Sequence, residues 1–426
     1  MHSWVGFYAG IVIATLSLTG VVALFKSELD YALNLSLFKV EPQTKQADIS
    51  AIIRDLREEH GAEGHIQTYP PNSPTDSWRL RFLRPGKFGF SQLEVFIDPY
   101  FGEILGERDY TRSLAYFVRQ LHVRLYESVW GRQIVGLAGI ALLLSTVTGL
   151  LIYGRFMKKQ VFAAIRTKTL RVKWADYHKL IGVATLAFNL MIAITGAWLG
   201  LQVYLQPLVL DGRPGGFTRE EKPLNKEQDL ATYVDYQAAL ATSAHLFPEL
   251  KPAFMVPSRD GSRTLRILGD VPGQAYERHT FSLTLDKQDL GELHRYDIRE
   301  ASAGDKLFFL QESMHFGDYG GITLKVVYTF FGLTSGFLSL AGFVVYLERN
   351  EKRRRERPRY TPMRPLVLRW TWAIVGVCVF LGVLQINFGP APPAILVLLA
   401  VYGSLLFVVL RALVRTIRAR LRPAAA

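Results

Sequence analysis

The chain has 426 residues, of which 49% are hydrophobic and 20% charged, with a formal net charge of +13 and a single cysteine, Cys378. One cysteine excludes an internal disulfide framework, Cys-x-x-Cys-His haem attachment, iron–sulfur clusters and thiolate zinc sites. The positive charge calls for no nucleic-acid partner, because the basic residues gather in loops between apolar segments, where membrane topology and anionic lipid account for them.

Several segments are apolar for about 20 residues, the length that crosses a bilayer core. The first has no cleavage-site pattern after Phe25, so it is predicted to be a retained span and not a signal peptide. Six transmembrane helices are expected in all. They cover residues 1–25, 132–153, 180–203 and 322–347, with two more in a hairpin over 366–411.

Basic residues predict the orientation of these spans. The loops 154–179 and 348–365 and the tail 412–426 are rich in arginine and lysine, which favours the cytoplasmic side. Both termini are then cytoplasmic. The two long segments, 26–131 and 204–321, are predicted to lie outside.

The two outside segments have the same order of elements. In 26–131, a helical stripe starting at Ile49 precedes strand patterns at 78–83 and 93–97 and a turn at 98–102. In 204–321, a helix at 236–247 precedes strand patterns at 263–268 and 280–285 and a turn at 286–291. The predicted fold class is therefore a mainly α membrane protein, with six transmembrane helices and two small α+β modules.

Four histidines occur in two registered pairs, each at or just before a hydrophobic segment. The run from His2 to Gly6 and Thr19-Gly20 recurs at identical spacing from His178 to Gly182 and Thr195-Gly196. His122, with Gly139 and Gly149 after it, recurs as His315, with Gly332 and Gly342. A single such histidine is explained by a hydrogen bond to an interfacial carbonyl, but the repeated set indicates ligands held at the two membrane faces.

These motifs, with the hairpins Asp-Pro-x-x-Gly-Glu-Ile at Asp98 and Leu-Asp-x-x-x-x-Gly-Glu-Leu at Leu285, resemble the PepSY-associated transmembrane-helix family over residues 1–347. Within that family the chain is similar to bacterial inner-membrane ferric-siderophore reductases, which carry b-type haems. The resemblance implies periplasmic PepSY-like modules, a cytoplasmic electron donor (reductase, flavin or quinol) and a ferric siderophore as acceptor from which Fe(II) is released.

Haem ligation also follows from the residues. Two neutral imidazoles on one haem iron leave no open position for oxygen and rearrange little on reduction, which suits electron transfer. The predicted topology assigns His2 and His178 to a cytoplasmic-side haem and His122 and His315 to a periplasmic-side haem, both haem b and non-covalent. A histidine with a different second ligand remains an alternative. The predicted partners of haem propionates are Arg124, Arg132 and Lys179.

Other patterns narrow the function. No Gly-x-Gly-x-x-Gly after a strand, no P-loop and no protease or esterase motif is present, so electrons are expected from a separate donor. Two alternatives stay open. A non-catalytic PepSY sensor or inhibitor-type binding protein would use the modules to bind peptides, with structural histidines. A component of an uptake transporter would need polar residues within its spans, for which Asn189, Gln202 and Lys325 are candidates.

Overall fold

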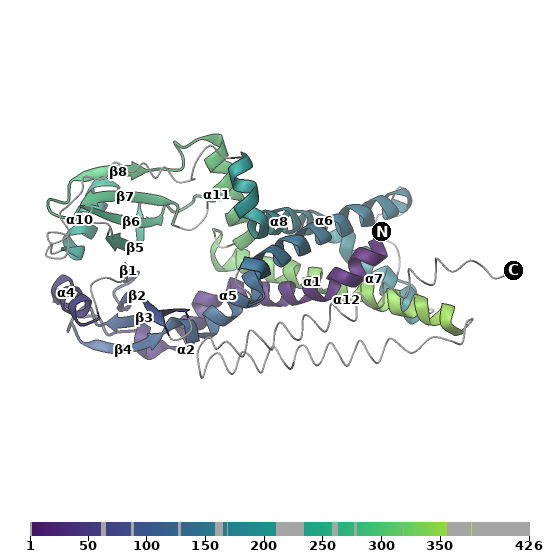
Figure 1. The fold of residues 1–426 in the computed structure, drawn as a ribbon, viewed down its shortest axis with the longest axis horizontal. Coiled ribbons are helices and arrows are strands. Elements are labelled where there is room, and N and C mark those ends of the chain that lie inside the picture. Colours follow the sequence, from purple (N-terminus) through teal and green to yellow (C-terminus); the bar gives the residue numbers. More distant parts are fainter. Residues whose placement is uncertain are drawn as a thin grey trace. The chain divides into compact units, whose positions relative to one another are not determined.

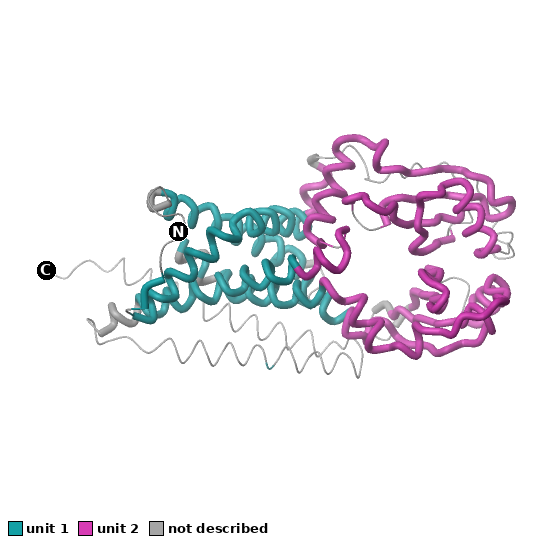
Figure 2. The backbone as a smooth tube through the Cα atoms, turned by 180° about the vertical axis from the view of Figure 1, so that it is seen from behind, with its two compact units in different colours: residues 1–23, 116–201, 327–426 teal, residues 24–115, 202–326 magenta. Residues whose placement is uncertain are grey.

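The computed structural model describes residues 2–60, 65–86, 89–126, 129–157, 165–167, 169–209, 234–257, 263–276, 279–317, 319–355 and 376. The chain divides into two compact units, coloured separately in Figure 2. The helical unit comprises 1–23, 116–201 and the chain from 327, and the sheet unit comprises 24–115 and 202–326. The predicted hairpin at 366–411, Gly376 excepted, and the predicted tail at 412–426 lie outside the described residues.

The helical unit is built mainly from helices of 11 to 35 residues, labelled in Figure 1. They are α1 (His2–Leu24), α5 (Leu114–Arg124), α6 (Val129–Met157), α7 (Leu170–Ala184), α8 (Leu186–Val209) and α12 (Gly321–Arg355). Small residues allow close helix crossings. A Cβ placed on Gly139 would lie 2.6 Å from the backbone nitrogen of Ala197, so α6 and α8 meet almost backbone to backbone. On α1, the Ser17 hydroxyl donates to the Gly332 carbonyl and accepts from the Gly336 amide, which attaches it to α12.

Three helices in the described part of the chain are long and apolar enough to cross a membrane: Gly131–Gly154, Leu186–Pro207 and Gly321–Arg349. A fourth span results if Ala9–Leu24 and α2 (Lys26–Leu33), bent by 57°, are counted as one. The prediction of six transmembrane helices is therefore wrong for this structure. These three helices and the bent pair overlap the four spans predicted at 1–25, 132–153, 180–203 and 322–347, although the third is broken at Thr185 and the first bends after Leu24. The other two, predicted over 366–411, lie outside the described residues, Gly376 excepted.

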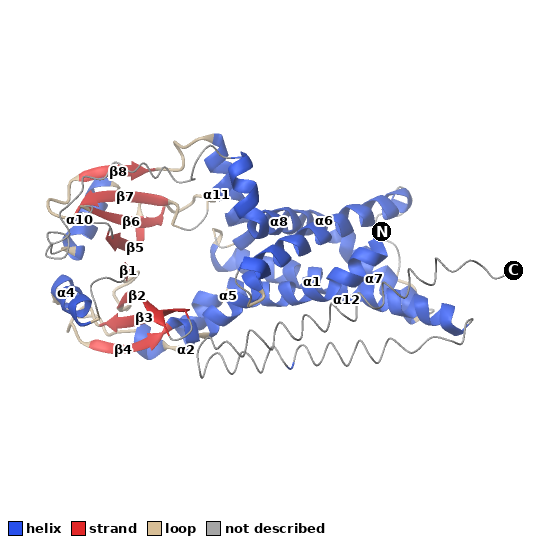
Figure 3. Cartoon of the chain, viewed as in Figure 1, coloured by secondary structure: helices blue, strands red, loops and turns tan. Residues whose placement is uncertain are grey.

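The sheet unit contains eight strands in one antiparallel sheet, shown in red in Figure 3. Their order across the sheet is β4-β3-β2-β1-β5-β6-β7-β8. The first four strands are β1 (His65–Tyr69), β2 (Trp78–Gly86), β3 (Gly89–Ile97) and β4 (Ile104–Asp109). The second four are β5 (Lys251–Pro257), β6 (Thr264–Asp270), β7 (Phe281–Asp286) and β8 (Glu292–Tyr296). The helices of this unit are α2, α3 (Leu35–Phe38), α4 (Ile49–Glu59), α10 (Tyr236–Leu246) and α11 (Ala303–Phe316), with a 3-10 turn, η1 (Tyr110–Arg112).

The prediction of two small separate modules is also wrong, because β1 and β5 pair and join the two halves into one sheet. Thr68 of β1 lies opposite Met255 of β5, and neither is exposed. Each half alone would leave an unpaired edge strand at this point, and edge pairing satisfies those backbone groups. A single hydrophobic core then contains residues from both halves, among them Leu80 and Ile267.

Helices α4 and α10 contribute to this shared core and bind each other at their N-termini. The Ser50 hydroxyl accepts from the Tyr236 amide at 2.9 Å, and the Gln237 side-chain oxygen accepts from the Ile49 amide at 3.1 Å. Asp235 caps α10 by accepting from the Ala238 amide at 2.8 Å. The first amides of both helices, which have no partner within their helices, are thereby satisfied.

The two predicted aspartate turns lie where the sequence places them, after β3 and after β7. In each turn the aspartate amide donates to a carbonyl five residues on, Glu103 for Asp98 and Gly291 for Asp286, both at 2.9 Å. Both turns contain a left-handed residue, Gly102 at φ +73° and Leu290 at φ +58°. The same backbone path therefore forms in both halves, although only the first uses glycine.

Candidate functional site

His2 and His178 lie close together in the helical unit, as their shared register predicts. His2 begins α1 and His178 lies in α7, and their ring centroids are 6.1 Å apart with an interplanar angle of 74°. Both side chains are half-buried. Two histidines 176 positions apart in the chain thus lie side by side.

The His2 ring is oriented by α6. Its Nδ1 lies 2.9 Å from the Ser145 carbonyl and 3.3 Å from the Thr148 hydroxyl. A carbonyl can only accept, so this bond selects the tautomer with hydrogen on Nδ1 and leaves the Nε2 lone pair available to a metal. A Cβ on Gly149 would lie 3.3 Å from Cε1 of the ring, so glycine allows the imidazole to lie directly on the helix backbone.

The His178 ring has an equivalent position against α12. Leu338, the repeat counterpart of Ser145, lies near this ring, but Nδ1 of His178 is buried and has no hydrogen-bond partner among the described residues. A Cβ on Gly342 would lie 3.3 Å from Cε1 and 3.8 Å from Nδ1 of His178, the same two distances that relate Gly149 to His2. The repeat is therefore present in side-chain contacts as well as in residue spacing.

The Thr19-Gly20 motif of the first span contacts His122. It lies in α5, and its Nδ1 is 3.0 Å from the Leu16 carbonyl and 3.3 Å from the Thr19 hydroxyl of α1. A Cβ on Gly20 would lie only 2.8 Å from its Cε1, so this contact needs glycine. As with His2, the carbonyl engages Nδ1, which selects the tautomer with hydrogen on Nδ1 and the lone pair on Nε2.

His315 belongs to the sheet unit. It lies in the last turn of α11, half-buried, with its ring centroid 6.0 Å from that of Phe316. The helix ends at Gly317, which adopts φ +62°. Because His122 and His315 fall in different units, the pairing of these two stays a prediction.

The three predicted propionate partners have different surroundings. Nε of Arg124, two residues after His122, is buried and has no hydrogen-bond partner among the described residues. Arg132 donates from Nε to the Leu199 carbonyl at 3.0 Å. Lys179 lies 3.6 Å from a carboxylate oxygen of Asp176. Arg124 is thus the candidate with a buried donor available for an anionic acceptor.

Asp176 attaches the segment 165–167 to α7. Its carboxylate accepts from Arg166 at 2.9 Å through each oxygen and from the Arg166 amide at 3.0 Å. The hydrogen bonds from Arg166 outweigh partial burial and lower the pKa of Asp176 to about 2. These hydrogen bonds attach the segment before α7 to Asp176, which lies two residues before His178 in the sequence.

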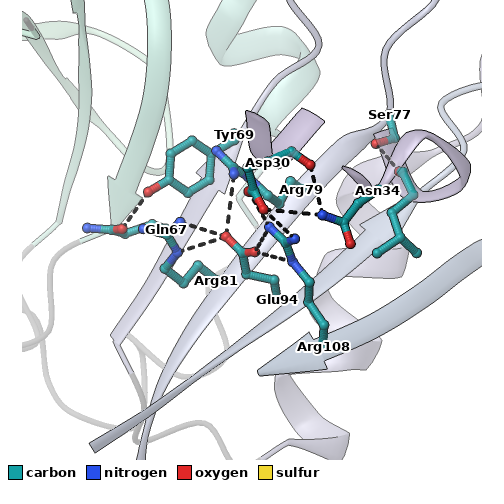
Figure 4. A network of polar contacts seen from close by, with 10 residues as sticks. Asp30, Asn34, Gln67, Tyr69, Ser77, Arg79, Arg81, Glu94 and Arg108 are labelled. Atoms are coloured by element: carbon teal, nitrogen blue, oxygen red, sulfur yellow. Dashed lines mark hydrogen bonds and ion pairs between the residues drawn. The ribbon is translucent and has the colours of Figure 1, made fainter. Parts of the chain in front are cut away.

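A second polar cluster, which the sequence did not predict, lies in the sheet unit (Figure 4). Glu94 of β3 is fully buried between Arg81 of β2, at 2.6 Å, and Arg108 of β4, at 2.7 Å, and Arg79 lies 3.4 Å away. Arg108 also binds Asp30 of α2 through two hydrogen bonds of 2.8 and 2.6 Å. Burial favours the neutral acid, but the three guanidinium groups prevail and lower the pKa of Glu94.

A family model described as the PepSY-associated TM region matches residues 1–349 of the chain. The chain belongs to this family. The match covers α1 through most of α12, including all three histidines of the helical unit and His315, so the expected membership of the PepSY-associated family is confirmed. This family member is a membrane protein, and its apolar helices are in contact with lipid.

One curated relative is an uncharacterized protein of Pseudomonas aeruginosa, 27% identical over 54% of this chain. The aligned region spans 62% of that protein, so it leaves more than a third of the relative unmatched. Its name carries no activity, substrate or cofactor. The function of this PepSY-associated protein therefore has to be argued from its own residues.

Proposed function

We propose that this PepSY-associated membrane protein is a di-haem oxidoreductase that passes electrons from the cytoplasm to the periplasm and reduces a ferric siderophore. One haem b would be held by His2 and His178 and the other by His122 and His315. The main observation behind this proposal is that the His2 and His178 rings lie side by side. The contacts of His122 and Arg124 support the proposal but would not lead to it by themselves.

The distance between these imidazoles fits a shared metal. Two metal–imidazole bonds of about 2 Å, extended to the ring centres, separate the centroids by about 6 Å. The observed separation is 6.1 Å. Nδ1 of His2 is already engaged by the Ser145 carbonyl, so Nε2 is the atom that would bind.

The glycine contacts support the same assignment. Gly149 and Gly342 each face Cε1 of one imidazole at the same distance, so neither ring is separated from its supporting helix by a side chain. A rigid backbone behind each ring limits rotation and keeps the ligand nitrogen in place when the charge at the metal changes. A haem with two histidine ligands supplies one-electron transfer.

The residues near His122 fit the outer site. The Leu16 carbonyl fixes its tautomer, and the buried Nε of Arg124 offers a charge-assisted hydrogen bond to a propionate carboxylate. Without such an acceptor this buried donor would cost about 1–3 kcal/mol. We infer that Arg124 is the main propionate partner on this side.

The direction of electron flow rests on the basic loops. Arg166, Arg171 and Lys173 precede the third predicted span, which favours a cytoplasmic location for this end of α7 in the bacterial inner membrane. The donor would be a cytoplasmic reductase, a reduced flavin or a quinol. One electron from it converts Fe(III) of the siderophore complex to Fe(II), which the chelator holds more weakly.

The experiment is to purify the full chain from haem-replete cells and record its visible spectrum and extractable haem. We expect two haems per chain, removable by acid acetone because no cysteine attachment is available. His178→Ala and His122→Ala should each lose one haem. The matched control is His294→Ala, because His294 is an exposed histidine of β8.

The variants also separate the two membrane faces. With His122→Ala, the cytoplasmic donor should still reduce the remaining haem but periplasmic Fe(II) release should stop. With His178→Ala, reduction by the cytoplasmic donor should fail while dithionite added outside still acts. A colourless wild-type protein would refute the proposal and favour a PepSY binding protein. Alanine variants of His2, His122, His178 and His315 that each keep both haems would do the same.

A further inference from the structure

Helix α2 carries exposed apolar side chains on one of its faces. Leu29, Ala32 and Leu33 lie at positions i, i+3 and i+4, which share one face of an α-helix, and we call them the outer face of α2. All three are exposed, and Leu33 exposes 63% of its surface. A single exposed leucine needs no explanation, but several on one helix face indicate a surface that another apolar phase covers.

Another side of α2 is attached to the sheet, as Figure 4 shows. Asp30 is buried and accepts hydrogen bonds of 2.8 and 2.6 Å from the Arg108 guanidinium of β4. The Asn34 side chain, directly after the helix, donates to the Asp30 carbonyl at 2.8 Å. Arg108 also binds the buried Glu94 of β3. These contacts fix the rotation of α2 about its own axis, and with it the direction of the outer face.

An ion pair places α2 beside the beginning of a second span. A carboxylate oxygen of Glu28 lies 2.5 Å from the ammonium nitrogen of Lys325 in α12. The part of α12 that can cross a membrane begins at Gly321, so Lys325 lies about 6 Å along it. A lysine this near the end of a span extends its ammonium group to the membrane surface. The first turn of α2 is therefore at the level of that surface.

The bend after α1 keeps α2 close to the same surface. With 23 residues, α1 is about 34 Å long and crosses a hydrocarbon core of about 30 Å. The following helix is bent from it by 57°. Over its eight residues, α2 therefore rises about 6–7 Å beyond a span along the bilayer normal, against about 12 Å for a straight continuation. The headgroup layer is about 5–8 Å thick on each side, so only the bent helix stays within it.

The charged residues of α2 favour the surface layer over the hydrocarbon core. Lys26, Glu28 and Asp30 occupy three of its eight positions. Charged side chains are costly inside the core and acceptable among the headgroups. We therefore expect α1 to cross the membrane by itself, and α2 to follow the span and not to form its second part.

Lipid fits the outer face better than a second copy of this chain does. A helix of eight residues presents a face of about 12 by 10 Å, on the order of 120 Å², whereas a stable interface needs about 800 Å² from each partner. Contact with lipid, in contrast, is already present on α1, where Leu18 and Val22 are exposed. The outer face of α2 continues this apolar surface beyond Leu24.

We propose that α2 lies in the surface layer of the membrane, at the end of α1, with its outer face in contact with lipid. Leu29 and Leu33 contact the acyl chains, while Asp30 stays paired with Arg108 of β4. The first half of the sheet is thereby attached to the membrane surface. This inference goes beyond the proposed function and does not depend on the haems.

The test measures the depth of single labelled positions in the full chain. In a Cys378→Ala background, Leu33→Cys is labelled with a nitrobenzoxadiazole fluorophore and placed in phosphatidylcholine nanodiscs. Matched nanodiscs contain a lipid with a nitroxide quencher either near the headgroup (shallow) or near the bilayer centre (deep). Ser27→Cys, exposed on the opposite side of α2, and Glu58→Cys, exposed on α4, are the controls. Quenching is a ratio between matched nanodiscs, so absorption by any cofactor cancels.

The shallow nitroxide should quench the label of Leu33→Cys about threefold more than the labels of the two controls, and Leu29→Cys should behave like Leu33→Cys. Equal quenching at all four positions would overturn the inference. Stronger quenching of Leu33→Cys by the deep nitroxide would overturn it too, because α2 would then belong to the span. A colourless protein with the expected quenching pattern would refute the proposed function alone.

Discussion

Substitution of Gly20 by alanine provides a direct test of the contact between α1 and His122. The added methyl group would lie 2.8 Å from Cε1 and 3.2 Å from Nδ1 of the imidazole. Carbon atoms in contact prefer about 3.5–4.0 Å, so the ring or the helix must move by roughly 0.7 Å or more. Such a shift would strain or break the hydrogen bond from Nδ1 to the Leu16 carbonyl, now 3.0 Å long.

The net effect can be estimated from two opposing contributions. Overpacking of a well-packed contact costs about 1–3 kcal/mol. Alanine in place of a helical glycine stabilises by about 1 kcal/mol. We therefore expect Gly20→Ala to destabilise the protein by up to about 2 kcal/mol. Gly6→Ala is the matched control, because Gly6 lies in the same helix and has no atom within 4 Å of the added methyl.

The assay is thermal unfolding of both variants in the same detergent, followed by circular dichroism, with visible spectra recorded in parallel. Gly6→Ala should melt at or slightly above the wild-type temperature, whereas Gly20→Ala should melt lower. If His122 holds the proposed outer haem, the visible spectrum of Gly20→Ala should also change. Equal melting temperatures and spectra for the two variants would show that His122 does not rest on Gly20.

Three further predictions follow from other parts of the molecule. Glu94→Gln leaves three arginines around a neutral amide and should destabilise the sheet unit by about 3–5 kcal/mol in denaturant unfolding. Glu107→Gln, at an exposed position, should cost little stability. Comparable losses in the two variants would show that the buried carboxylate is unimportant. The pKa of Asp176 is lowered to about 2 from 3.8, so its ion pair with Arg166 stabilises fully above pH 3.8 and is lost as the pH falls towards 2. The free energy that holds segment 165–167 on α7, followed by proteolysis, should fall by about 1 kcal/mol over this range, a small value because Arg166 is largely exposed. Asp176→Asn should abolish this pH dependence. With the natural cysteine replaced, Thr167→Cys should react with membrane-impermeant maleimide only after lysis and Thr44→Cys in intact spheroplasts; the reverse pattern would invert the proposed orientation.

The sequence alone predicted the local features that depend on nearby residues. Long apolar runs located α1, α6 and α12, and the aspartate turns at Asp98 and Asp286 were placed correctly, because apolar runs and turn geometry are properties of short segments. The registered spacing of His2 and His178 also predicted that they lie together, since two similar helices that pack in one bundle place equivalent residues at equivalent depths.

Tertiary structure decided the features that depend on which distant segments meet. Pairing of β1 with β5 turned two expected modules into one sheet, and nothing in either strand indicates its partner, because backbone hydrogen bonds between strands are the same for any sequence. The same pairing brings Tyr69 beside Phe254, with ring centroids 5.5 Å apart. The carbonyls of Ser145 and Leu16 that orient two histidines were equally invisible, since every residue has a carbonyl and only packing of α1 against α6 and α5 selects these two.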